Sequence, residues 1–167
     1  HPARRAALTA ALTADAGDPK EVAIRDLLLK AGGGIVSADL RVDRKTLLAR
    51  GKIAAKLPDL SPWSHVAGLP LSGRLDVTAG LDAQAGQGVE LKATGERLAY
   101  GGGESRVVLG RLEAAARLDD VLGTPYGKAR ASLTDARFAS GGLSNATLTL
   151  DGAKPGRFGF RGEAKGT

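Results

Sequence analysis

Apolar and polar residues alternate with a period of two over most of the chain. The clearest run extends from Leu47 to Leu57, where every second residue is small or apolar and charged residues such as Arg50 and Lys52 lie between them. Successive side chains of a β-strand project to opposite sides of the sheet. The run therefore predicts a strand with one apolar side and one polar side.

The same alternation recurs along the rest of the chain, with turn-forming residues between the repeats. The apolar series are Val36 to Val42, Leu71 to Ala83, Val89 to Ala93, Val108 to Leu118, Ala129 to Leu133, Ala146 to Leu150 and Phe158 to Phe160. The turns are expected at Gly32–Gly34, Gly86–Gly88, Gly101–Gly103, Gly123–Pro125, Gly141–Gly142 and Lys154–Gly156. Long strands joined by short turns predict an antiparallel meander.

A short helix is predicted near the N-terminus, over residues 3–13. This stretch is rich in alanine, which favours helix, and Leu8 and Leu12 are four residues apart on one helical face. The turn-forming run from Asp15 to Pro19 is expected to end this helix.

A second short helix is predicted over residues 62–67, where prolines exclude a central strand. Ser61 suits the N-cap, Pro62 the first helical position and Gly68 the C-terminal cap. The segment also holds Trp63, the only tryptophan of the chain. We expect it to mark a boundary between two sets of strands.

The chain is accordingly divided into four parts of one continuous β domain. Residues 1–19 form a short N-terminal helix and linker, residues 20–57 a first strand set, residues 58–69 the short helix, and residues 70–167 a second strand set. The start at His1 has neither an initiator methionine nor a signal peptide. We expect the chain to be a piece of a longer protein.

The apolar side of such strands must be covered, and one helix of six residues is too small for that task. Two packed sheets, a closed barrel and a sheet curled around an apolar ligand remain as alternatives. The hydrophobic share is 43%, but aromatic residues make up only 4% and methionine is absent. Rows of alanine and glycine supply little bulk for a core, so the composition favours an all-β fold curled into an open groove.

Charge and residue chemistry narrow the classes of function. The net charge of +6 arises from mixed charges, and aromatic residues for base stacking are scarce, so nucleic-acid binding is not expected. Cysteine is absent and no apolar run is long enough to span a membrane.

No catalytic cluster is found in the sequence. Gly101–Gly103 lacks the lysine and helix of a phosphate loop, and Ser64 and His65 are adjacent residues that do not face each other on a helix. Asp76 and Asp82 lie about 20 Å apart along one strand, which is too far for acid–base catalysis. We expect no enzymatic activity, no cofactor and no metal site.

One stretch carries a resemblance to a known family. The run Leu57-Pro-Asp-Leu-Ser-Pro-Trp-Ser-His-Val-Ala-Gly-Leu-Pro-Leu-Ser-Gly-Arg-Leu-Asp-Val77 resembles a feature of the TamB and AsmA-like family, in which a Leu/Pro-rich turn precedes a Leu-Ser-Gly-x-Leu strand. Residues 22–163 share that family's texture of long alternating strands and glycine turns. The family's C-terminal signature is not evident, which implies an interior or N-proximal portion.

The resemblance implies a function in the envelope of a Gram-negative bacterium. It implies a periplasmic part of a protein anchored in the inner membrane, whose taco-shaped sheet conducts phospholipid towards the outer membrane and supports its assembly. It also implies a TamA-like outer-membrane barrel of the assembly type as partner. The residues expected to touch acyl chains are Val36, Leu40, Val42, Leu47, Ile53, Leu57, Trp63, Leu71, Leu75, Val77, Leu81, Val89 and Leu91.

Two alternatives stay open at this point. A structural or adhesin-like β-solenoid would show a short fixed repeat, whereas these strands are long and uneven. A β-sandwich binding module would need more bulk between its sheets. The final residues, from Phe158 to Thr167, read as a strand still in progress. Because open strand edges recruit other chains, we expect self-association through a sheet edge.

Overall fold

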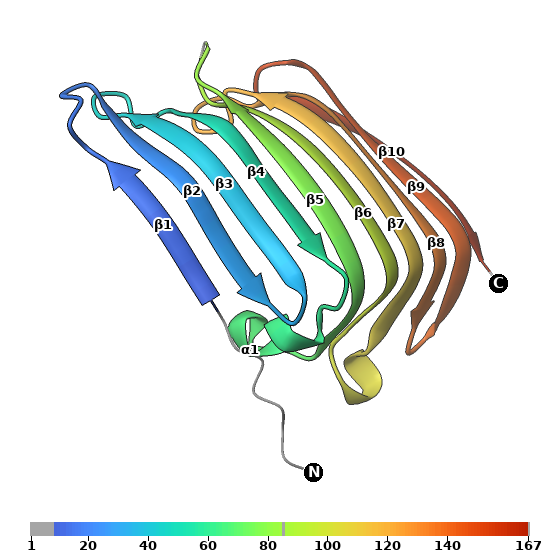
Figure 1. Cartoon of the computed structure of the whole chain (residues 1–167). Coiled ribbons are helices and arrows are strands. Elements are labelled where there is room, and N and C mark those ends of the chain that lie inside the picture. The colour runs from blue at the N-terminus through green and yellow to red at the C-terminus, as the bar shows by residue number, and fades with distance from the viewer. Residues whose placement is uncertain (1–8, 85, 167) are drawn as a thin grey trace.

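The computed structural model describes residues 9–84 and 86–166 and is dominated by ten β-strands (Figure 1). The strands are β1 (Thr9–Asp15), β2 (Glu21–Ala31), β3 (Gly34–Asp43), β4 (Ala49–Leu57), β5 (Leu71–Asp82), β6 (Gly88–Tyr100), β7 (Val107–Asp119), β8 (Tyr126–Phe138), β9 (Gly141–Lys154) and β10 (Arg157–Gly166). The predicted all-β class is confirmed.

The strands form a single open sheet in the order of the sequence. Each strand pairs antiparallel with the next, so β1 and β10 are the two outer strands (Figure 1). The predicted antiparallel meander is therefore confirmed. Within the described residues there is neither a second sheet nor closure into a barrel, because all ten strands belong to one sheet and β1 is not hydrogen-bonded to β10.

Glycine-containing turns connect most of the strands where they were predicted, but the turn predicted at Gly141–Gly142 is wrong, because both residues belong to β9 and the turn consists of Ala139 and Ser140. Gly32 and Gly33 form the two-residue turn between β2 and β3, with φ of 54° and 78°. Two successive residues with positive φ give the turn whose twist matches that of the flanking strands. Pro155 and Gly156 form a two-residue turn of another type between β9 and β10, in which Gly156 has a φ of 68° and proline fixes a negative φ at the first position.

The predicted N-terminal helix is wrong for its described part. Residues 3–8 lie outside the described residues, and Thr9–Asp15 form β1, paired with β2. Leu12 lies at an irregularity of this pairing and is 59% exposed. Alanine favours helix only weakly, and backbone hydrogen bonds to the neighbouring strand outweigh that preference.

The predicted second helix is present. It consists of η1 (Ser61–Trp63) followed by α1 (Ser64–Ala67), and Gly68 ends it in the left-handed conformation. The expected N-cap is wrong, because Ser61 is itself the first helical residue. Leu60 is the N-cap and makes no side-chain capping bond, whereas Asp59 before it accepts hydrogen bonds from the Ser61 amide at 2.9 Å and hydroxyl at 2.7 Å.

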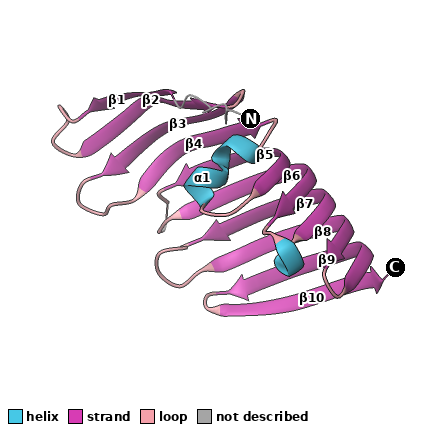
Figure 2. Cartoon of the chain, turned by 90° about the horizontal axis from the view of Figure 1, so that it is seen from below, coloured by secondary structure: helices cyan, strands magenta, loops and turns pink. Residues whose placement is uncertain are grey.

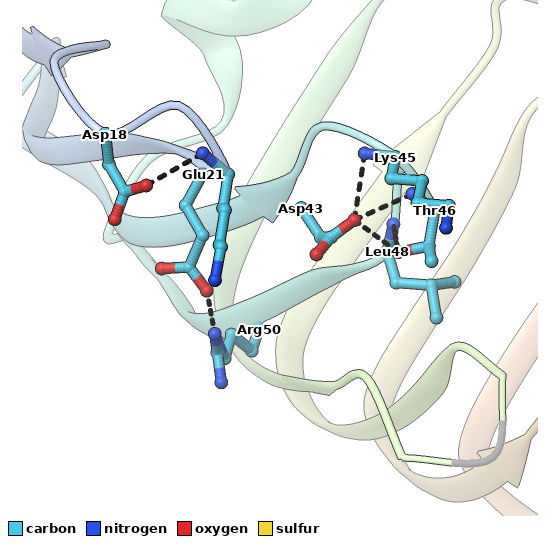
Figure 3. A network of polar contacts seen from close by, with 8 residues as sticks. Asp18, Glu21, Asp43, Lys45, Thr46, Leu48 and Arg50 are labelled. Atoms are coloured by element: carbon cyan, nitrogen blue, oxygen red, sulfur yellow. Dashed lines mark hydrogen bonds and ion pairs between the residues drawn. The ribbon is translucent and has the colours of Figure 1, made fainter.

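The predicted start of the long strand after residue 46 is also corrected. Leu47 has a φ of 59° and lies in the turn between β3 and β4, and β4 begins at Ala49. Asp43 organises this turn by accepting hydrogen bonds from the amides of Lys45 and Thr46 and from the Thr46 hydroxyl (Figure 3). These local bonds hold the backbone out of the sheet ladder.

The strand β2 was not identified individually by alternation, because a β-bulge interrupts its period. The pairing with β3 shifts between Ile24 and Leu27, and Asp26 at the shift has a φ of 54°. Asp39 of β3 stabilises the bulge by accepting a hydrogen bond from the Asp26 amide at 3.1 Å. The extra residue returns Leu27 to the side of the sheet that Ile24 occupies.

Candidate functional site

The strand register collects the apolar side chains on one side of the sheet. Residues directly opposite each other in adjacent strands project to the same side. One such row crosses nine strands and consists of Leu27, Ala38, Ile53, Ala79, Leu91, Ala116, Ala129, Leu150 and Phe160. A neighbouring row consists of Val36, Ala55, Val77, Ala93, Ala114, Ala131, Leu148 and Gly162. We call this side the apolar face.

The opposite side carries the charges. Its central row consists of Asp39, Lys52, Gly80, Glu90, Arg117, Lys128 and Asp151. Exposed ion pairs join neighbours there, such as Lys128 and Asp151 at 3.5 Å and Lys92 and Glu90 at 3.4 Å. We call this side the charged face. Exposed pairs of this kind contribute little to stability, but their charges favour exposure of this face to water.

Ten of the thirteen residues predicted to touch acyl chains lie on the apolar face. They are Val36, Leu40, Val42, Ile53, Leu57, Leu75, Val77, Leu81, Val89 and Leu91. Leu57 is buried and the others are half-buried. The register therefore brings together residues of four strands, β3 to β6, that are up to 55 positions apart in the sequence, from Val36 to Leu91.

The other three predicted residues are placed differently. Leu47 is 71% exposed in the turn before β4 and does not belong to the strand. Leu71 pairs with Tyr100 beyond the irregularity at Gly73, which separates it from the regular rows. Trp63 belongs to η1, outside the sheet.

The face also extends beyond the predicted residues. Leu112, Ala114 and Ala116 of β7 continue the rows, and β8 to β10 carry them as far as Phe160. The two-residue period of residues 108–160 signalled this extension. In the two rows, β7 and β8 contribute only the alanines Ala114, Ala116, Ala129 and Ala131, whereas longer side chains lie on this face in β2 to β6 and in β9 and β10.

The short helical segment lies beside β5 at one end of the sheet (Figure 2). A Cβ atom added to Gly34 would meet the Leu57 side chain at 2.9 Å and the Trp63 Nε1 atom at 3.2 Å, so the indole lies beside both residues. Leu57 and Leu60 are 8% and 7% exposed. A small buried cluster therefore forms where the helix meets the ends of β3 and β4.

The remainder of the apolar face has no protein layer over it. Among the described residues, the extensive contacts of each strand are with its neighbours in the sheet, and η1 and α1 lie beside β5 and the adjoining ends of β3 and β4. No large side chain is fully buried in the described part of the chain. Leu148 and Phe160 are 51% and 73% exposed. An uncovered apolar surface of this extent is typical of a binding site.

The perturbed acidic groups lie away from this face and have structural roles. The Thr46 amide and hydroxyl hold the pKa of Asp43 below its ordinary value. The amide and hydroxyl of Ser61 lower the pKa of Asp59 in the same way. Both carboxylates organise turns, because hydrogen bonds to the charged form stabilise it.

Within the described residues, no group of three or more histidine, cysteine or acidic side chains is arranged to hold a metal ion. None of the helices in that part of the chain has the length and apolar character needed to cross a membrane.

Comparisons with known proteins give no relative for this chain. No protein family, no curated protein and no solved structure matches it.

Proposed function

We propose that the apolar face binds the acyl chains of phospholipid, as part of an envelope protein that conducts lipid between the inner and outer membranes. The observation that carries the proposal is the row of apolar residues across nine strands with no protein layer over most of it. Covering such a surface with hydrocarbon releases about 0.8 kcal/mol per buried CH₂ group.

The dimensions suit a chain-like apolar ligand. Neighbouring strands lie about 4.8 Å apart, so the apolar row across nine strands offers a path of about 38 Å across the sheet. That length exceeds one extended acyl chain, so several binding positions overlap along the path. A lipid could then move from one position to the next without leaving the apolar surface.

The side chains of the face favour sliding over tight recognition. Ala79, Ala116 and Ala129, which belong to the nine-strand row of the apolar face, offer neither charges nor hydrogen-bonding side chains. Burial of hydrocarbon is non-directional, so such a surface does not distinguish one acyl chain from another. Head groups would lie at the rim, in water.

The proposal includes the shape and the surroundings of the protein. The strands curve along their length in Figure 1, and we propose that this curvature makes a taco-shaped groove with the apolar face inside. In this proposal the groove lies in the periplasm, the anchor in the inner membrane and a TamA-like barrel in the outer membrane. No reaction is catalysed.

Native mass spectrometry of protein purified from bacterial membranes tests the proposal. The wild-type chain should carry phospholipid, and Val77→Asp should lose it, because a carboxylate would face hydrocarbon. Thr78→Asp is the matched control, since Thr78 is the next residue of β5 and lies on the charged face opposite Lys92.

A second variant keeps the test valid if Val77→Asp fails to fold. Ala116→Trp places a bulky ring on the floor of the face without adding a charge, and it should reduce bound phospholipid by obstruction. Circular dichroism establishes that each variant retains its β-sheet. Equal lipid in all folded variants, or none in the wild type, would contradict the proposal.

A further inference from the structure

A depression of about 330 Å³ lies on the charged face over β6, β7 and β8, which are adjacent strands within the sheet (Figure 1). Four cationic side chains line it, and we call them the basic cluster: Lys92, Arg117, Lys128 and Arg130. Glu90 is the only acidic residue of the lining. All five residues are exposed, and together they carry an excess of three positive charges.

The floor of the depression is an alanine that lies between two cations. Lys92 of β6 is directly opposite Ala115 of β7, which is directly opposite Arg130 of β8. Neighbouring strands lie about 4.8 Å apart, so about 10 Å separates the backbones of the two cationic residues. A methyl group is too short to fill the space between two long side chains, which explains the depression.

The other two members of the basic cluster close one side of this space. Arg117 follows Ala115 by two residues on β7, so both side chains project to the charged face, and it lies directly opposite Lys128. Arg117 is also a diagonal neighbour of Arg130, at about 7 to 8 Å, which long side chains can span. Because like charges in directly opposed positions destabilise a sheet, an anion bound between Arg117 and Lys128 would relieve their repulsion.

The arginines of the basic cluster keep their hydrogen-bond donors available. The two lysines pair with carboxylates, Lys92 at 3.4 Å and Lys128 at 3.5 Å. Within residues 9–84 and 86–166, neither Arg117 nor Arg130 forms an ion pair. A guanidinium group presents two parallel N–H donors that match two oxygens of a phosphate.

We propose that the depression over Ala115 binds a phosphate group, with Arg117 and Arg130 as its principal ligands and Lys92 and Lys128 beside them. A carboxylate has two oxygens and one charge, so it satisfies one guanidinium group. A phosphate has enough oxygens and charge for both. Soluble phosphate esters and the head groups of anionic lipids both present such a group. The site lies on the side of the sheet opposite the apolar face, so it does not rest on the function proposed above.

Titration of the isotope-labelled full chain with inorganic phosphate, followed by NMR at constant ionic strength, tests the site. The amide signals of β6, β7 and β8 should shift and reach saturation. Arg117→Gln and Arg130→Gln should each raise the dissociation constant for phosphate about tenfold, because each removes charge-assisted hydrogen bonds.

Arg41→Gln is the matched control for net charge. Arg41 is exposed on the charged face of β3, two residues after Asp39, and forms no ion pair among the described residues. Its replacement removes the same charge at a distance from the basic cluster. The affinity for phosphate should therefore stay at the wild-type level.

Ala115→Leu tests the depression itself, because it fills the floor without altering any charge. Phosphate binding should weaken about tenfold or more in this variant, since the added side chain occupies the position of the ligand. Circular dichroism establishes that the variant retains its β-sheet. A diffuse attraction between phosphate and a basic protein would be insensitive to this change.

Co-sedimentation with vesicles identifies the source of the phosphate group. Vesicles of phosphatidylcholine alone are compared with vesicles that also contain phosphatidylglycerol. Binding that requires phosphatidylglycerol and falls in Arg130→Gln, but not in Arg41→Gln, assigns the phosphate to a lipid head group. Saturable binding of inorganic phosphate without such vesicle binding assigns it to a soluble phosphate ester.

Three results would overturn the proposal. The first is a wild-type chain that shows neither saturable binding of inorganic phosphate nor vesicle binding that depends on Arg130. The second is equal weakening in Arg41→Gln and Arg130→Gln, which would show that net charge alone attracts phosphate. The third is unchanged binding in folded Ala115→Leu.

Discussion

The side chain of Gln87 pairs with the backbone of Ala49 as a neighbouring strand would. Its Oε1 atom accepts a hydrogen bond from the Ala49 amide at 2.7 Å, and its Nε2 atom donates to the Ala49 carbonyl at 2.9 Å. Nε2 also lies 3.0 Å from the Asp82 carbonyl, and the Gln87 carbonyl accepts from the Val121 amide. One buried residue thus joins the ends of β4, β5 and β6 with the loop after β7.

Replacement of Gln87 by alanine should destabilise the chain by about 2 to 4 kcal/mol, because several buried hydrogen bonds are lost at once and backbone groups are left unpaired. Chemical denaturation measures the change. Gln84→Ala is the control, since the exposed side chain of Gln84 makes no hydrogen bond within the described residues. Similar losses in both variants would show that the Gln87 side chain has no special role.

Gly51→Ala should destabilise the chain by about 2 kcal/mol or more, because the residue has a φ of 140° and an added Cβ would overlap the Asp39 carbonyl. Gly80→Ala is the matched control, as its φ is not positive and its added Cβ would lie 4.0 Å from that of Glu90. Thermal unfolding distinguishes the two. An unchanged melting temperature in Gly51→Ala would mean that β4 can relax there.

Trp63→Phe should be nearly neutral, whereas Trp63→Ala should cost about 2 kcal/mol through lost packing against Leu57 and Gly34. The Trp63 Nε1 atom is buried without a hydrogen-bond partner among the described residues, so its removal sacrifices no bond. Denaturation monitored by circular dichroism compares the variants. A large loss in Trp63→Phe would reveal a partner for the indole N–H.

Acid should weaken the turn at Asp43, because the pKa of this carboxyl is lower in the folded chain than in the unfolded chain. Its contribution is fully present above the unfolded value of about 3.9 and is lost as the pH falls through the folded value. Asp43→Asn should therefore flatten the dependence of stability on pH in this acidic range. A variant with the wild-type acid profile would contradict the assignment.

The alternation of residues determined much of this protein. A strand with an apolar side needs only its own two-residue period, so the meander, the turns at Gly32–Gly33 and Pro155–Gly156, and most members of the apolar face could be predicted. The short helix and its C-terminal cap at Gly68 could also be predicted, because their signals lie within the segment itself. Local patterns determined the structure where competing local preferences were weak.

The tertiary structure decided the rest, because it depends on partners distant in sequence. Residues 9–15 are alanine-rich and become a strand only because β2 offers them a ladder. Leu47 lies outside the sheet because hydrogen bonds to Asp43 fix the turn. The bulge at Asp26 interrupts the two-residue alternation of β2, so this strand could not be predicted from alternation. Whether apolar sides face each other or remain open depends on where the strands lie in space, and here a single sheet leaves most of the apolar face without a protein layer. No pattern in the sequence indicates the role of Gln87, because its side chain binds the backbone of Ala49, which is 38 residues away.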